Sequence, residues 1–139
     1  MHKVIGIAAL ILTVFIIFVV VIFVIPRTSI KNDSNASIVF KYLDNDIEVQ
    51  ISSKDETQIR DVFNNKILYK DYLSCGFSED VSIRFNNSTS NESLIFCIAC
   101  DGCPKIYLVQ SDKYFTISEK DRYELDEILR EYGVTFPCV

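Results

Sequence analysis

Three of the five cysteines fall within one short stretch, where their spacing permits several kinds of chemistry. Cys97, Cys100 and Cys103 are separated from one another by two residues each. Thiolates at such spacing bind zinc or an iron–sulfur cluster, and a Cys-x-x-Cys pair can exchange thiol and disulfide. Cysteines of an exported domain instead form structural disulfides. The conformation of this stretch therefore decides which chemistry is available.

The segment from Cys97 to Cys103 resembles the first three cysteines of a bacterial ferredoxin cluster motif. The resemblance covers seven of the 139 residues and implies a site for iron–sulfur or zinc. The ferredoxin motif continues with three residues, a cysteine and a proline, whereas here Pro104 follows at once and the next cysteine is Cys138. A metal or thiol-redox module built on Cys97-x2-Cys100-x2-Cys103 is therefore the alternative interpretation of function.

The dipeptide Asp101-Gly102, between two apolar runs, predicts a two-residue β-hairpin turn of type I′. Such a turn places Cys100 opposite Cys103 and gives the hairpin one face without charges or hydroxyls. We expect that apolar face to lie in the core, and it holds Ile95, Cys97, Ala99, Pro104, Ile106 and Leu108. Cys97 is then a buried free thiol, and the other two cysteines stand on the opposite face.

We interpret the remaining cysteines as structural. Cys75, Cys100, Cys103 and Cys138 are the disulfide candidates, and four cysteines allow three connectivities. Joining the central pair to the two distant cysteines closes loops of about 25 to 40 residues, each worth roughly 3–4 kcal/mol in the chain-entropy model. Long-range pairing is therefore expected, with no metal or other cofactor.

The N-terminus predicts a membrane anchor over residues 1–25. Residues 4–25 are 22 consecutive residues without a charge, enough for a helix to cross the hydrocarbon core of a bilayer. The run is too long for the apolar region of a signal peptide, although a cleaved signal peptide is the alternative. The lipid bilayer is therefore the expected partner of residues 4–25 in a single-pass protein, and residues 26–36 are expected to form a polar linker.

We expect the part that follows the anchor to lie on the extracytoplasmic side. The basic residues flanking the apolar run are nearly balanced, so charge does not set the orientation. A cysteine-rich hairpin favours an oxidising compartment. Five Asn-x-Ser/Thr sequences begin at Asn32, Asn35, Asn86, Asn87 and Asn91, and we interpret them as marking Asn- and Ser-rich loops.

Residues 37–139 predict one α+β domain. Alternating apolar residues indicate strands near 38–42, 47–51, 81–85, 94–99, 105–109 and 114–117, and a short last strand at 134–136. Capping boxes at Ser53–Glu56 and Ser118–Asp121 begin helices near 54–64 and 119–132. Both helices should cover one face of a mostly antiparallel sheet. Their expected buried residues are Ile59, Val62, Phe63, Leu125, Ile128 and Leu129.

Composition excludes several functions. His2 is the only histidine and precedes the anchor, so the domain has no Ser-His-Asp or Cys-His pair and no histidine-containing zinc site. Past residue 26 there are 13 basic and 19 acidic residues, a net charge of −6 that argues against nucleic-acid binding. Adjacent acids such as Asp126 and Glu127 are typical of a solvated helix face. We therefore expect a non-enzymatic binding or structural role, with an unidentified protein partner.

Overall fold

The computed structural model describes residues 2–23, 25–42, 45–70, 76–87, 89 and 92–136. Within these ranges it describes the backbone but not the side chains of residues 2–6, 8, 9, 21–23, 42, 78 and 79.

Six antiparallel strands among the described residues form one sheet in the order β2-β1-β3-β4-β5-β6. The prediction of an α+β fold with an antiparallel sheet is confirmed. The strands are β1 Ser34–Tyr42, β2 Asn45–Gln50, β3 Phe77–Asn87, β4 Ser93–Ala99, β5 Lys105–Leu108 and β6 Lys113–Thr116. A short 3₁₀ turn, η1 (Val109–Ser111), joins the last two. The short last strand expected at 134–136 is absent, since these residues lie in no strand.

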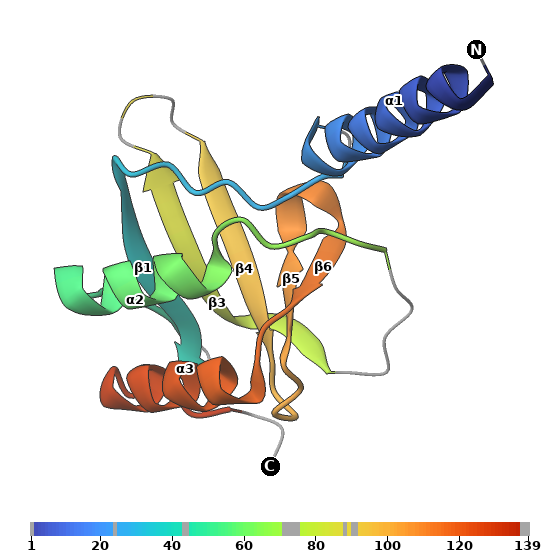
Figure 1. Cartoon of the computed structure of the whole chain (residues 1–139). Helices are drawn as coiled ribbons and strands as arrows, with labels where there is room; N and C mark the ends of the chain where they lie inside the picture. Colours follow the sequence, from blue (N-terminus) through green and yellow to red (C-terminus); the bar gives the residue numbers. More distant parts are fainter. Residues whose placement is uncertain are drawn as a thin grey trace.

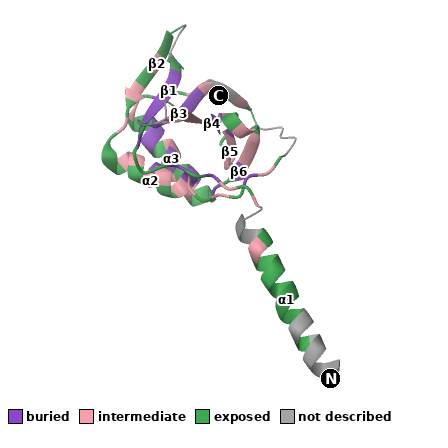
Figure 2. Cartoon of the chain, turned by 90° about the horizontal axis from the view of Figure 1, so that it is seen from above, coloured by how far each residue is buried: buried purple, intermediate pink, exposed green. Residues whose placement is uncertain are grey.

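Two helices, α2 (Ser53–Phe63) and α3 (Glu119–Glu131), cover the same face of this sheet, as predicted (Figures 1 and 2). The cap of α3 is the predicted box, in which the Ser118 hydroxyl accepts a hydrogen bond from the Asp121 amide. The cap of α2 lies one residue earlier than predicted, because Ser52 rather than Ser53 accepts from an amide, that of Asp55. Each cap satisfies backbone donors that a helix start leaves unpaired.

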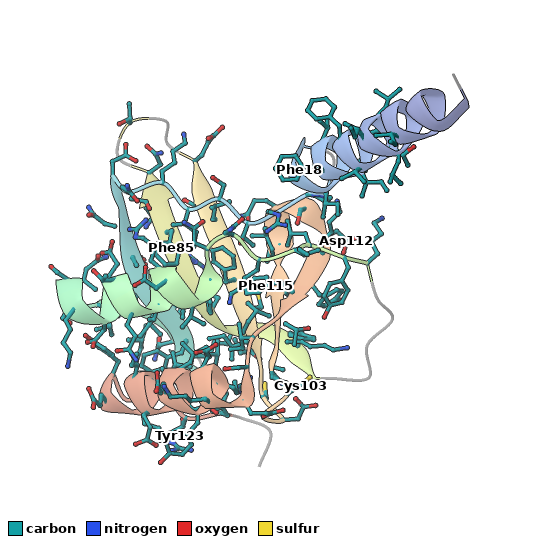
Figure 3. The ribbon with its side chains drawn as sticks, in the orientation of Figure 1. Phe18, Phe85, Cys103, Asp112, Phe115 and Tyr123 are labelled. Atoms are coloured by element: carbon teal, nitrogen blue, oxygen red, sulfur yellow. The ribbon has the colours of Figure 1, made fainter. Side chains whose placement is uncertain are left out.

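Aromatic side chains form the centre of the core between the helices and the sheet. The ring of Phe63, at the end of α2, lies 5.1 Å from that of Phe96 on β4 and 5.5 Å from that of Phe115 on β6. Phe85 contacts Phe96 edge to face at 5.8 Å, and Figure 3 shows Phe85 and Phe115 between the sheet and the helices. Five of the six helix residues predicted to be buried are buried, and Val62 is half-buried.

The ends of the two helices are joined by polar contacts. The Tyr132 hydroxyl, just past α3, donates to the Asp55 carboxylate at 2.7 Å in the first turn of α2 and accepts from the Ser52 amide at 2.8 Å. The hydroxyls of Tyr132 and Ser52 lower the pKa of Asp55, because both donate to its charged form. These two contacts join the residue after α3 to the start of α2.

Residues 26–36, where the sequence predicts a polar linker, lie against the end of α2. Thr28 is buried, and its hydroxyl donates to the Phe63 carbonyl at 2.6 Å while accepting from the Lys66 amide at 2.8 Å. Ile30 belongs to the core cluster. Strand β1 begins at Ser34, within the segment predicted as linker, so the folded domain starts before residue 37.

Arg60 of α2 connects that helix to the start of β1. Its guanidinium pairs with Glu56 at 2.5 Å and donates to the Ser34 carbonyl at 2.8 Å and to the Lys31 carbonyl. The same group lies 5.2 Å from the centre of the Phe85 ring. Arg60 therefore binds two backbone carbonyls where the chain enters β1.

Helix α1 (His2–Phe23) projects from the domain (Figures 1 and 2). Its described apolar side chains are largely exposed, with Leu10 at 66 % and Phe18 at 60 %. Within the described part of the chain, no helix is both long enough and apolar enough to span a membrane.

Replacing Phe63 by alanine should destabilise the domain by about 3–5 kcal/mol, because it leaves a cavity between α2, β4 and β6. Urea unfolding of the full chain in detergent, followed by tyrosine fluorescence, measures the change, since all seven tyrosines follow residue 41. Phe63→Leu should cost less than half as much. Tyr123→Ala, at a side chain that is 64 % exposed on α3, is the control and should change stability by less than about 0.5 kcal/mol. Equal losses for Phe63→Ala and Tyr123→Ala would contradict this core.

Candidate functional site

The turn that carries the cysteines differs from the predicted one. Gly102 has a positive φ of 75°, but Asp101 is not among the described residues with positive φ, so the turn is not of type I′. The Asp101 carboxylate instead accepts from the Cys103 amide at 3.1 Å and from the Gly76 amide at 3.4 Å. These bonds hold a longer loop, and the pairing of β4 with β5 shifts by one residue.

This shift reverses the predicted faces of β4. Cys97 lies opposite Tyr107 instead of Ile106, and Phe96 lies opposite Leu108. Phe96 and Leu108 belong to the core cluster beneath the helices, whereas Cys97 does not. The prediction that Ile95, Cys97 and Ala99 form the core face is therefore wrong, because a one-residue change of register exchanges the two faces of a strand.

Cys97 is nevertheless buried, at 1 % exposure, on the face of the sheet that points away from α2 and α3. We call this the outer face. Aromatic residues gather there on the neighbouring strands: the Tyr107 ring lies 4.9 Å from that of Tyr114 and 6.3 Å from that of Phe77. Burial raises the pKa of Tyr107, and its hydrogen bond to Asp112 acts in the same direction.

The other two cysteines lie at the turn. Cys100 is buried, and its amide donates to the Gly76 carbonyl at 3.0 Å. Cys103 is half-buried. Neither cysteine begins a helix. The predicted disulfide partners Cys75 and Cys138 lie outside the described residues.

The described cysteines do not form a metal centre. No group of three or more Cys, His, Asp or Glu side chains in the described part of the chain is arranged to hold a metal ion. The adjacent acids of α3 are engaged in ion pairs. Asp126 binds Arg122 at 3.0 Å, and Glu127 binds Arg130 at 2.5 Å.

Arg122 of α3 is the residue that holds the cysteine turn. Its guanidinium is buried, at 3 % exposure, and donates to the carbonyls of Ala99 at 2.8 Å and Cys103 at 2.6 Å. Its Nε donates to Asp126 at 3.0 Å on the same helix, and the Phe136 ring lies 5.8 Å away. The guanidinium thus satisfies two carbonyls of the turn at once and couples the hairpin to α3.

Sequence reasoning did not identify Arg122. Its position in the sequence could have identified it. Arg122 stands three residues before Leu125 and seven before Leu129, so it lies on the apolar side of α3 although it is charged. A charge on such a stripe must be paired, and Asp126 stands at the i+4 position that can pair with it. The carbonyl partners come from a distant turn and cannot be read from the sequence.

No protein-family model, curated protein or solved structure matches this chain. The site must therefore be interpreted from its own geometry. In that geometry Arg122 holds the cysteine turn in place. Among the described residues around the turn, no nucleophile is activated by a neighbouring base.

Replacing Arg122 by methionine should destabilise the domain by about 3–5 kcal/mol, because it leaves the Asp126 carboxylate and two turn carbonyls without their partner. Arg130→Met removes an exposed ion pair on the same helix and should cost less than about 1 kcal/mol. Urea unfolding measures both. Amide hydrogen exchange should also become faster at residues 99–103 in the Arg122 variant. Equal costs for the two variants would show that Arg122 does not hold the turn.

Proposed function

We propose that the chain is a single-pass membrane protein, anchored by residues 4–25. Its α+β domain has a non-enzymatic binding or structural role outside the cytoplasm. The observation that carries the proposal is the exposure of the apolar side chains on α1. The polar groups of the domain support the non-enzymatic role, because Arg60, Arg122 and Asp80 are each engaged in bonds that stabilise the fold.

The exposed side chains of α1 are of the kind that water disfavours. The large apolar ones that are 44–66 % exposed are Ile7, Leu10, Ile11, Leu12, Val14, Phe15, Ile16, Ile17, Phe18 and Val20. A contiguous apolar surface of this kind marks a contact with lipid or with another protein. The described side chains extend only from Ile7 to Val20, and the rest of the proposed span rests on the uncharged sequence of residues 4–25.

Membrane extraction tests the anchor. The full chain expressed in cells should stay in the membrane pellet at alkaline carbonate. The double substitution Val14→Asp and Phe15→Asp should release much of it, because each acid near the centre of a spanning helix costs about 2.5–3.5 kcal/mol. Tyr123→Asp adds a charge at an exposed position of α3 and should leave the protein in the pellet. Release of the unaltered chain, or a mature N-terminus near residue 37, would refute the anchor.

Disulfides are the second part of the proposal, and contacts of neighbouring described residues favour one connectivity. The Gly76 carbonyl accepts from the Cys100 amide, and Cys75 is the residue before Gly76. Consecutive Cα atoms are about 3.8 Å apart, and a disulfide needs Cα atoms within about 7 Å. We therefore favour the pair Cys75–Cys100, which leaves Cys103 and Cys138 as the second pair of the four candidates.

Peptide mapping of the exported protein, alkylated without reduction, tests these pairs. Each bond forms when two thiols give two electrons and two protons to an oxidised thiol–disulfide oxidoreductase. The expected result is Cys75 linked to Cys100, Cys103 linked to Cys138, and Cys97 slow to alkylate because it is buried. Five reactive thiols together with stoichiometric zinc or iron would contradict the pairing and would support the metal module instead.

A further inference from the structure

The chain is bound to the domain within a few residues of the end of α1. Arg27 pairs with Ile67 in an antiparallel bridge, and the Pro26 carbonyl accepts from the Leu68 amide at 2.9 Å. Figure 1 shows these two segments side by side next to the end of α1. Backbone bonds therefore hold residues 66–68 against the end of the proposed anchor.

This pairing sets the depth of Ile67 in a membrane that residues 4–25 cross. Arg27 is two residues past that uncharged run, so it lies at most about 7 Å from the hydrocarbon core. The headgroup layer is about 5–8 Å thick on each side of a bilayer. Ile67 is opposite Arg27, and such a pair of Cα atoms is about 5 Å apart. Ile67 and its neighbours therefore lie within or close to the headgroup layer.

Basic residues are concentrated in these two segments although the domain as a whole is acidic. Residues 25–32 and 64–70 contain four basic residues and no acidic one: Arg27, Lys31, Lys66 and Lys70. The rest of the chain past residue 26 contains nine basic and 19 acidic residues. The net negative charge of the domain therefore conceals a local excess of positive charge next to α1.

Strand β6 adds a further lysine to this place. Tyr69 and Tyr114 form a second antiparallel bridge, so the next pair along it is Lys70 and Lys113. Lys66, Lys70 and Lys113 form no ion pair with any described residue. Lys70 is exposed and the other two are half-buried, so their ammonium groups are accessible from solvent.

Nearby carboxylates do not neutralise this positive charge. Asp112, in the turn before β6, accepts from the Tyr107 hydroxyl at 3.1 Å. Asp61 lines a groove along α2 together with Lys66, but the two side chains form no ion pair. Asp71 follows these segments in the sequence and lies outside the described residues. The three acids are outnumbered by four bases, so the surface keeps a positive charge.

Ile67 gives the same surface an apolar centre. Its side chain is 49 % exposed, and outside α1 the only other large apolar or aromatic side chain exposed among the described residues is Tyr123. Figure 3 shows Tyr123 on the side of the domain away from α1. Exposed apolar side chains among lysines and arginines are typical of surfaces that lie in the membrane interface, where the charged ends reach the headgroups.

We infer that the surface formed by Arg27, Lys66, Ile67, Lys70 and Lys113 lies against the bilayer and binds the phosphates of anionic lipid headgroups. The exposed apolar side chains of α1 enter the bilayer, and this surface continues from the end of α1. The inference rests on the anchor proposed above and does not depend on the side of the membrane. It adds the orientation of the domain and the class of lipid that it contacts.

The test uses the full chain in nanodiscs of phosphatidylcholine, with ¹³C at the isoleucine δ1 methyl groups. A trace of lipid with a nitroxide near its acyl carbonyls is added, either as phosphatidylglycerol or as phosphatidylcholine. The Ile67 signal, identified by its loss in Ile67→Val, should be broadened about fivefold more by the phosphatidylglycerol, the effect of one basic side chain near an anionic surface. Ile17 of α1 should be broadened by both lipids, and Ile128 of α3 by neither.

Two pairs of substitutions that remove equal charge test the lysines. Lys70→Gln with Lys113→Gln should lower the preference of Ile67 for phosphatidylglycerol toward that for phosphatidylcholine, because it removes two of the bases that bind the headgroup. Lys54→Gln with Lys120→Gln changes exposed lysines of α2 and α3 and should leave the preference unaltered. Concentrated sodium chloride should weaken the preference in the unaltered chain, since salt screens exposed charges.

Several results would overturn this inference. They are equal broadening of Ile67 by the two lipids and an equal loss of preference in the two double variants. Broadening of Ile17 without broadening of Ile67 would contradict the orientation of the domain and leave the anchor intact, whereas an unaffected Ile17 would contradict the anchor and this inference with it. A shift of Ile67 with inorganic phosphate or with a soluble glutamate-rich peptide, together with no preference between the lipids, would assign the surface to a soluble ligand instead.

Discussion

The contact of Phe63 with Phe96 and Phe115 is the interaction on which the rest of the fold depends. It places the end of α2 over the middle of the sheet. The backbone that follows α2 then forms hydrogen bonds with the backbone of Thr28. Further on, Tyr69 pairs with Tyr114 at the edge of β6 through two backbone hydrogen bonds of 2.9 Å. Because α2 and α3 both pack on this face, neither covers the outer face. The placement of both helices on one face of the sheet follows from this one cluster.

Much of the fold could be predicted, because its helices and strands follow from local sequence patterns. The alternation of Ile47 and Val49 with Glu48 and Gln50, and the cap at Ser118, each depend on residues close together in sequence. The turn could not be predicted in the same way. Asp-Gly is compatible with more than one turn, and here the Asp101 carboxylate selects the longer one by binding the amides of Cys103 and Gly76. One distant contact thereby exchanged the two faces of β4.

The candidate site was predictable in composition but not in arrangement. The sequence indicated a cysteine-rich hairpin, yet Cys97 is buried on the outer face and not beneath the helices. Arg122 shows the limit. Its partners are carbonyls 19 and 23 residues away in the chain, and they cannot be identified before the strands are paired.

The most direct test of the proposed anchor uses the absence of tryptophan from the chain. Single substitutions Phe15→Trp on α1 and Tyr123→Trp on α3 each introduce one fluorescent reporter at an exposed position. In bilayers whose acyl chains carry bromine near their ends, the account predicts strong quenching of the tryptophan at position 15 and little quenching at position 123. Equal fluorescence of the two variants in brominated and ordinary lipid would contradict it, because α1 would then lie outside the hydrocarbon core.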